Sequence, residues 1–315
     1  MITKTHLLVS TFLLLSVSLA TAGVRQTVQF TVKAVDEEGR PLSGVQITTR
    51  FAGERTEGAT DTNGLFVVRA NVLSREGGFV ATKDGYYASR AKVLFPSIQD
   101  GRCQPWDSVV TTVVRRVINP IPMYAKRVDK KIPRENTPIG FDLVLGDWTR
   151  PYGTGQQPDL IFRFSRQVTS DTDYEGSLLL SFVNPLDGVL ENYEAIPGSE
   201  LRLPRNAPES GYATNWVYHV GQNATNGRFG CRGQGDDKSY FLRVRSKTDE
   251  KGQLKEALYG KVKGLIRVRG VARKGDADII FNYYLNPTPN DRNLEFDPKR
   301  NLFQNLDEFE TVSEP

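Results

Sequence analysis

Basic residues are concentrated in two stretches near the C-terminal end of the chain, where they alternate with apolar residues. These stretches are YFLRVRSK, residues 240–247, and LKEALYGKVKGLIRVRG, residues 254–270, and the turn sequence TDEKGQ separates them. Alternate residues of a strand lie on one face, so a hairpin of the two would gather the cations around an aromatic ring. The predicted cationic face comprises Arg243, Arg245, Lys247, Tyr259, Lys261, Lys263, Arg267 and Arg269.

Such a face would bind an anion in a salt-dependent way. We expect an anionic polysaccharide, a lipopolysaccharide head group or another envelope component, or an acidic protein as the partner. The alternative is an ordinary solvated face that keeps an edge strand from aggregating. Nucleic acid is not expected, because the chain has no recognised nucleic-acid motif and a net charge of only +4.

A second candidate site is the aromatic loop GDWTRPYGTGQQPD, residues 146–159, which carries Trp148 and Tyr152. A glycine-rich loop that displays these rings would stack on neutral sugars. The alternative is that Trp148 anchors the loop or the core. No helix signal follows the loop, so a phosphate-binding loop is not indicated.

Carboxylates at predicted strand ends form a third candidate, because a pair of them could hydrolyse a glycosidic bond. The distance between the two carboxylates decides whether they can catalyse hydrolysis, and it cannot be obtained from sequence. The alternatives are that these residues are solvated turn residues or ligands of a structural calcium ion. No other cofactor is expected. These residues are Asp142, Asp147, Asp159, Asp187, Asp291, Glu295 and Asp297.

Histidine is nearly absent, which excludes several enzyme classes. His6 lies in the predicted signal segment, so His219 is the only histidine of the predicted mature chain. A metal site of several histidines is therefore impossible within one chain, and no G-x-S-x-G elbow accompanies His219. We assign no catalytic residue and no metal ligand, and we expect a binding protein more than an enzyme.

The N-terminus has the features of a secretory signal over residues 1–22. Lys4 precedes an apolar run, and Ala20-Thr21-Ala22 fits the small-residue cleavage rule. An uncleaved anchor is the alternative, but the run is shorter than the ~20 residues that span a bilayer. We expect a secreted or periplasmic chain that does not span the membrane after cleavage. In such a compartment Cys103 and Cys231 would form a disulfide, with a reactive thiol or metal ligand as the alternative.

Strand patterns extend along the chain and predict an all-β fold. In TVQFTVKAV, residues 27–35, Val28, Phe30, Val32 and Ala34 share one face. Glycine-rich turns at short intervals favour a small antiparallel sandwich over residues 23–95, and later strand patterns favour a larger β-sandwich or jelly roll over residues 140–303. Residues 96–139 are expected to be a proline-rich linker with one strand, and residues 304–315 a frayed acidic tail.

The first of these regions resembles the carboxypeptidase regulatory-like family, which has a transthyretin-like β-sandwich. The resemblance covers about residues 26–95, and its matching positions are turn and core residues, so it implies a fold and no chemistry. In particular, Asp61 and Asn63 in ATDTNGLF fit a turn, because Gly64 comes too early for a calcium-binding loop. The matching positions are Gly39, Pro41, Leu42, Gly44, Val45, Asp61, Asn63, Gly64, Phe66, Gly85 and Tyr86.

The C-terminal part resembles a family of secreted bacterial proteins of unknown activity, through NPIPMYAK, GFDLVLGDW and YYLNPTPNDRNLEFDPKRNLF. That resemblance implies an envelope or extracellular setting. We therefore expect a non-enzymatic binding or structural protein of the cell envelope. The alternative is a carbohydrate-active protein that binds neutral glycans or hydrolyses them with the strand-end carboxylates.

Overall fold

The computed structural model describes residues 25–193, 195–230, 238–273 and 275–315. Apart from one 3-10 turn at Pro298–Arg300, every regular element in this part of the chain is a β-strand. The strands form four sheets, three of them purely antiparallel, which confirms the all-β prediction. The predicted signal segment, residues 1–22, lies outside the described residues.

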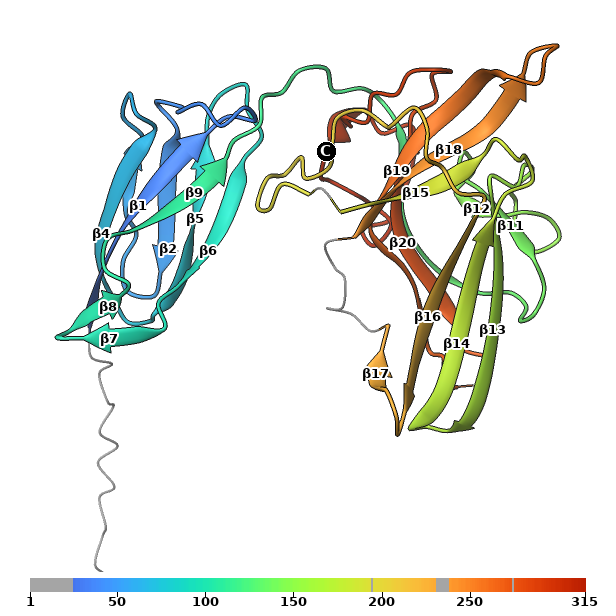
Figure 1. Cartoon of the computed structure of the whole chain (residues 1–315), viewed down its shortest axis with the longest axis horizontal. Coiled ribbons are helices and arrows are strands. Elements are labelled where there is room, and N and C mark those ends of the chain that lie inside the picture. Colours follow the sequence, from blue (N-terminus) through green and yellow to red (C-terminus); the bar gives the residue numbers. More distant parts are fainter. Residues whose placement is uncertain (1–24, 194, 231–237, 274) are drawn as a thin grey trace, which may run out of the picture.

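Two sheets form what we call the first sandwich (Figure 1, blue to green). One sheet has the order β4-β1-β8-β7, with β9 also paired to β1, and the other has the order β3-β2-β5-β6. The strands are β1 Gln26–Val35, β2 Gln46–Phe51, β3 Glu57–Ala59, β4 Leu65–Val72, β5 Glu76–Thr82, β6 Ser89–Leu94, β7 Ser97–Gln99, β8 Arg102–Gln104 and β9 Ser108–Val113.

The core of the first sandwich follows from the alternation of its strands. Val28, Phe30, Val32 and Ala34 are fully buried, as the pattern in β1 predicts. The ring of Phe30 lies 6.1–6.4 Å from three other phenylalanine rings that come from β2, β5 and the end of β6. The turn prediction at Asp61 also holds, since its Oδ1 accepts hydrogen bonds from the backbone N–H groups of residues 63 and 65.

The segment expected to be a linker with one strand contributes four strands, β7 to β10, to the sheets. Strand β9 runs parallel to β1 and pairs with it along its length, and β10 Tyr124–Lys131 pairs with β20. The basic and proline-rich composition of residues 118–137 concealed β10, because only Ala125 and Val128 mark its apolar positions. The chain between the two sets of sheets is therefore the short stretch from β9 to β10.

Two further sheets form what we call the second sandwich. A five-stranded sheet has the order β10-β20-β19-β18-β15, and a six-stranded sheet has the order β12-β11-β13-β14-β16-β17. The strands not yet given are β11 Ile139–Asp142, β12 Asp147–Trp148, β13 Leu160–Ser170, β14 Asp173–Ser181, β15 Gly188–Asn192, β16 Asn215–Asn223, β17 Gly227–Phe229, β18 Ser239–Thr248, β19 Leu254–Arg269 and β20 Asp278–Leu285.

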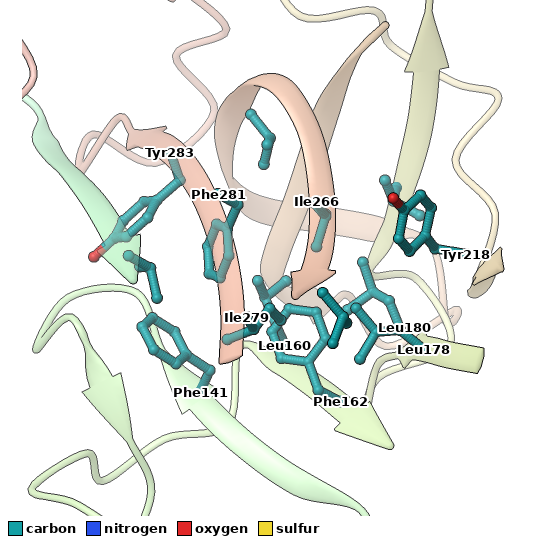
Figure 2. Packing of buried hydrophobic residues seen from close by; sticks show 14 of the residues in the cluster. Phe141, Leu160, Phe162, Leu178, Leu180, Tyr218, Ile266, Ile279, Phe281 and Tyr283 are labelled. Carbon is teal, nitrogen blue, oxygen red and sulfur yellow. The ribbon is translucent and has the colours of Figure 1, made fainter. Parts of the chain in front are cut away.

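The core of the second sandwich lies between these sheets. Figure 2 shows Phe281 and Ile266 of the five-stranded sheet facing Phe162 and Leu178 of the six-stranded sheet. The opposite face of the five-stranded sheet is also covered in part. There Phe241, Tyr259 and Tyr284 pack beneath Leu294, Phe296 and Val312 of the C-terminal segment. Strands β18 and β19 are therefore buried on both faces over part of their length.

The acidic tail is not frayed, contrary to expectation. Glu310 accepts the backbone N–H of Arg127 through its carbonyl oxygen, at 2.8 Å, and its carboxylate lies 2.7 Å from the ammonium of Lys126. Val312 is buried, and Glu314 forms an ion pair with Lys263. The tail thus lies along β10, an edge strand of the second sandwich, and satisfies some of its backbone groups.

The two sandwiches contact each other through polar groups. Arg115 lies at the end of the first sandwich, and it bonds both the carboxylate of Glu37 and the carbonyl oxygens of Leu201 and Leu203. Those two residues belong to the long loop between β15 and β16. The same loop pairs with β6 through Ser89 and residue 199, so it reaches from one sandwich to the other.

Cys103 is a free thiol that is fully buried in the core of the first sandwich. Burial raises the pKa of its thiol. Within the described ranges there is no disulfide, and Cys231, the predicted partner, lies outside them.

Candidate anion-binding cleft

The eight residues of the predicted cationic face do not share one surface. Two features of the strands separate them: β18 and β19 lose their regular pairing at bulges near Arg245 and near Gly264, and both faces of the sheet are partly buried. Lys247 lies at the end of the hairpin, where its ammonium is 2.6 Å from the carboxylate of Glu256. Arg243 lies over the ring of Tyr212, with its guanidinium carbon 4.6 Å from the ring centre.

Tyr259 and Lys261 are core residues and not ligand-binding residues. Tyr259 is 5% exposed and Lys261 is 1% exposed. The Lys261 ammonium donates to the carbonyl oxygen of Leu294, at 2.6 Å, and lies 4.8 Å from the centre of the Tyr284 ring. Burial lowers the pKa of Lys261 to about 7. The side chains do alternate between the two faces of β19, but the C-terminal segment covers the face that carries Tyr259 and Lys261.

Arg245 points to a pair of buried carboxylates. Its Nε donates to Asp159 at 2.7 Å, and its Nη2 donates to Asp159 at 2.9 Å and to Asp142 at 3.1 Å. The residue has a φ of 55°, which is unusual for a residue other than glycine. The bulge thus turns Arg245 away from the face that strict alternation predicts.

The remaining three residues, Lys263, Arg267 and Arg269, lie in a concave basic surface that we call the arginine cleft. It consists of two adjoining cavities, each about 350 Å³, that share Arg127, Arg267 and Ile280. A third cavity adjoins the first of them, and its lining includes Asp276 and Asp278, so the basic surface ends there. Among the described residues that line the arginine cleft, six are basic and none is acidic. They are Arg127, Arg202, Arg228, Lys263, Arg267 and Arg269.

Sheet register explains how these cations meet. Arg127, Asn282 and Lys263 lie opposite one another across β10, β20 and β19, and Ile280 and Arg267 form the next pair along the same face. The other face of these strands packs into the core through Val128 and Phe281. The core side of the sheet thereby holds the basic side in a fixed arrangement.

The charges in the cleft are only partly neutralised. Arg269 lies 2.7 Å from Asp129 and 3.0 Å from Asp278, and Arg127 lies 3.7 Å from Asp129. Arg267 has no ion pair within the described part of the chain and lines both cavities. Burial and the nearby Arg202 lower the pKa of Lys263 to about 8. Like charges gathered in this way favour an anion between them.

Sequence reasoning missed Arg127, Arg202 and Arg228. Arg127 had no clear local signal, because in YAKRVDKK the apolar Ala125 and Val128 lie on opposite faces of β10 and do not alternate. Arg202 lies in the loop between β15 and β16, and only the three-dimensional arrangement brings it to β19. Long-range contacts of this kind have no local sequence signal.

The aromatic loop is not a sugar platform of two rings. Trp148 is 4% exposed, and its ring contacts Phe141 and Phe162 edge-on at 5.4 and 6.1 Å between centres. Its Nε1 donates to the carbonyl oxygen of Lys131, at 3.1 Å. Tyr152 is 38% exposed. Trp148 is thus a core residue, because the loop folds back onto the second sandwich.

Most of the candidate carboxylates organise backbone. Asp142 accepts hydrogen bonds from four backbone N–H groups, at Val144, Leu145 and residues 156 and 157, in addition to Arg245. Although burial raises the pKa of Asp142, these bonds lower it overall. Glu295 accepts from the hydroxyl of Tyr87 and from two backbone N–H groups. Such saturated carboxylates have few lone pairs left for catalysis.

Asp147, Asp291 and Asp297 have similar local roles, since each accepts a backbone N–H within its own loop. His219 is exposed on β16 opposite Ser177. Across the described residues, no three histidine, cysteine or acidic side chains lie close enough together to hold a metal ion. The same part of the chain contains no helix suited to crossing a membrane.

Comparisons with known proteins show similarity at the level of structure alone. No protein-family model matches the chain, and no curated protein matches it. Among solved structures, 3-chlorocatechol 1,2-dioxygenase from Rhodococcus opacus is 16% identical with a TM-score of 0.26, and the match covers 31% of this chain and 62% of that one. The chain therefore spans less than two thirds of the dioxygenase.

Longer matches have even lower identity. A candidate carbohydrate-binding protein from Bacteroides uniformis is 11% identical with a TM-score of 0.20, over 81% of this chain and 95% of that one. A DUF3823 family protein from Bacteroides ovatus is 8% identical with a TM-score of 0.20, over 74% and 95%. At these scores the similarity indicates no activity, and the carboxypeptidase regulatory-like resemblance is not confirmed.

Proposed function

We propose that this chain is a non-enzymatic binding protein of the cell envelope, secreted or periplasmic, that holds an anionic glycan in the arginine cleft. The observation that carries the proposal is the cleft itself, whose described lining has six basic residues and no acidic one. A planar guanidinium suits carboxylate and sulfate groups because it donates two parallel hydrogen bonds. The ring of Tyr174 at the first cavity would pack against a sugar.

The first sandwich would then serve as a spacer or docking domain. The two sandwiches would form two domains, with the division between β9 and β10. An acidic protein is a second class of partner for the same cleft. Hydrolysis is less well supported, because Asp142, Asp159 and Glu295 have their oxygens bound by backbone N–H groups and arginines.

The direct test is calorimetric titration of the protein with a heparin hexasaccharide and a hexagalacturonate, and with maltohexaose as the neutral comparison. We expect binding of an acidic probe at about 50 mM NaCl that is largely lost at about 500 mM. Arg267→Ser should weaken it about 10-fold, since one charge-assisted contact is worth roughly 1.4 kcal/mol. Affinity should also fall as the pH rises past about 8, where Lys263 loses its proton.

Arg163→Ser is the matched control, because Arg163 is an exposed arginine of the same sandwich on β13, outside the cleft. It should bind the acidic probe as the unmodified protein does. Equal loss in both variants, or binding that does not respond to salt, would show that the cleft is not the site.

A further inference from the structure

Lys263 differs from the other described cations of the arginine cleft in the chemistry that its side chain can perform. The others are arginines, which stay protonated in proteins, whereas a lysine that loses its proton is a nucleophile that attacks carbonyl carbons. The Lys263 side chain is 16% exposed and lines the second cavity of the cleft, so a ligand in that cavity can reach its amine. The cleft thus contains a group that can form a covalent bond with what it binds.

The backbone of β19 holds Lys263 in a fixed position. Lys263 lies opposite Ser239 of β18 on one side and opposite Asn282 of β20 on the other, so the strand is paired on both edges there. The pairing becomes irregular directly afterwards, at Gly264, whose φ is 77°. The side chain therefore starts from ordered backbone. A reacting group needs such support, because it has to meet its target in a defined geometry.

The surroundings of Lys263 favour the neutral amine. Burial and the nearby guanidinium of Arg202 lower its pKa to about 8. About a quarter of these side chains then carry no proton at about pH 7.5, against roughly one in a thousand for a lysine of ordinary pKa. Lysines that are desolvated or lie next to another cation are the ones that form imines in enzymes.

A lowered pKa alone does not make a lysine reactive, and Lys261 of the same strand shows why. Its pKa is lowered further, to about 7, but the residue is 1% exposed. Its ammonium donates to the carbonyl oxygen of Leu294 beneath the C-terminal segment, which separates it from the cleft. Lys263 combines a lowered pKa with an accessible cavity, and Lys261 is therefore an internal control.

The rest of the second cavity determines which carbonyl compound would fit. Arg127, Arg202 and Arg267 line it and would hold an anionic group of the ligand. Asn282 lines the same cavity from the position opposite Lys263. Its amide N–H groups can donate to the carbonyl oxygen, which gains negative charge as the amine attacks.

Glu314 limits access to the amine. It forms an ion pair with the Lys263 ammonium, but it belongs to the C-terminal tail and its side chain is 57% exposed. An ion pair with so exposed a partner is weak, and an anionic ligand that the arginines hold can replace the carboxylate. Replacement also removes an acid that favours the protonated lysine.

We propose that Lys263 forms an imine with a carbonyl compound that carries an anionic group. The neutral amine adds to the carbonyl carbon, a proton moves from nitrogen to oxygen, and loss of water leaves a C=N bond in place of the C=O bond. No oxidant or reductant takes part, and water reverses the reaction. An acidic sugar whose open-chain form has an aldehyde belongs to this class, so the inference rests on the proposed function and extends it to covalent capture of a reducing end.

The test uses two aldehydes of similar size, the anionic 4-formylbenzoate and its neutral methyl ester. The intact protein is incubated with each aldehyde at about pH 7.5 and low salt, where the attraction between charges is least screened. Sodium cyanoborohydride reduces the imine to a stable amine, and peptide mass spectrometry gives the modification rate of each lysine. The anionic aldehyde should modify Lys263 about 10-fold faster than the ester does, as expected for one charge-assisted contact. It should also modify Lys263 about 10-fold faster than exposed Lys92, while Lys261 stays unmodified.

Three variants separate anion binding from nucleophilicity. Arg267→Ser should slow the reaction of Lys263 with the anionic aldehyde about 10-fold and change the reaction with the ester little. Glu314→Gln should speed the former about 3-fold, since it removes a weak surface ion pair. Arg163→Ser is the matched control and should change neither rate.

Modification of Lys263 no faster than that of Lys92 would overturn the proposal, and the calorimetric titrations would still decide the proposed function by themselves. Fast modification of Lys263 at equal rates by both aldehydes would also overturn it, because the ligand would then need no anionic group. That result would count against anion binding in the cleft as well.

Discussion

Lys261 shows how a single basic side chain can belong to the core of this protein. It is fully enclosed between the five-stranded sheet and the C-terminal segment, beside the Tyr284 ring. Burial lowers its pKa from an ordinary value of 10.5 to about 7. Between pH 7 and pH 10.5 the unfolded chain therefore keeps a proton on Lys261 that the folded chain has lost. Because of this difference, the free energy of unfolding rises with pH over that range.

We predict that Lys261→Met flattens this rise. The slope of the free energy of unfolding against pH should fall by up to about 1.4 kcal/mol per pH unit between pH 7 and 10. Lys263, whose pKa is lowered to about 8, should supply the slope that remains. Urea unfolding at a series of pH values measures this. Lys92→Met is the control, because Lys92 is exposed on β6, and the same slope in all three proteins would refute the prediction.

Arg245 and Arg267 show why residue type and spacing did not fully locate the site. Both occur in alternating basic stretches, yet one bonds two buried aspartates and the other lines the cleft. The bulge that turns Arg245 depends on bonds from Asn184 and Asp187, which are more than fifty residues away. No property of the local sequence records those bonds.

At the scale of elements, the alternation of apolar and polar residues was sufficient to predict most strands of both sandwiches. The exposed and buried positions of β1, β4 and β14 follow their sequences, since each strand has one face in a core. Alternation failed for β10, whose outer face carries Arg127 and Asp129 and whose apolar residues are few. It also failed for β15, a short strand in a loop-rich region, because its pairing with β18 is a long-range contact.

The C-terminal segment is the element with the most direct influence on the arginine cleft. Glu314 pairs with Lys263, one of the cleft cations, and Glu310 pairs with the neighbouring Lys126. An acidic ligand would compete with Glu314 for Lys263. If the cleft binds an anion as proposed, the tail would lower its apparent affinity by an amount set by this ion pair.

We predict that Glu314→Gln binds the heparin hexasaccharide about 5-fold more tightly at low salt, as expected for loss of a competing surface ion pair of roughly 1 kcal/mol. Calorimetric titration gives the two dissociation constants. Glu308→Gln makes the same change of charge at an exposed tail position without a described ion pair, and should differ little from the unmodified chain. Equal gains in both variants would mean that the tail acts through net charge alone.

At the scale of the molecule, one buried carboxylate joins the two sandwiches. Glu295, 1% exposed, accepts the hydroxyl of Tyr87 at 2.9 Å and the backbone N–H groups of Ile118 and Asn119 at 2.9 and 3.0 Å. It also lies 3.0 Å from Arg205 of the loop between β15 and β16. These partners come from the first sandwich, the connection and the second sandwich, so a single side chain bonds all three.

Glu295→Gln should loosen this junction. Glutamine has one acceptor oxygen in place of two and no charge for Arg205, so we expect a loss of about 3 kcal/mol in the free energy of unfolding. Small-angle scattering should also show a larger radius of gyration. Glu38→Gln removes an exposed ion pair within the first sandwich and should change neither quantity. An unchanged unfolding curve for Glu295→Gln would count against the assigned role of Glu295.

The loop between β15 and β16 has a consequence for how the chain can be divided. Gly198 accepts the backbone N–H of Arg90 through its carbonyl oxygen, and the N–H of Glu200 donates to Ala88, so the loop caps the outer strand of the first sandwich. A fragment that ends after β9 would keep every strand of that sandwich and still leave this strand uncovered. Expressed alone, it should self-associate through its open strand edge. A protease that cuts the loop in the intact protein should expose the same edge and promote the same self-association.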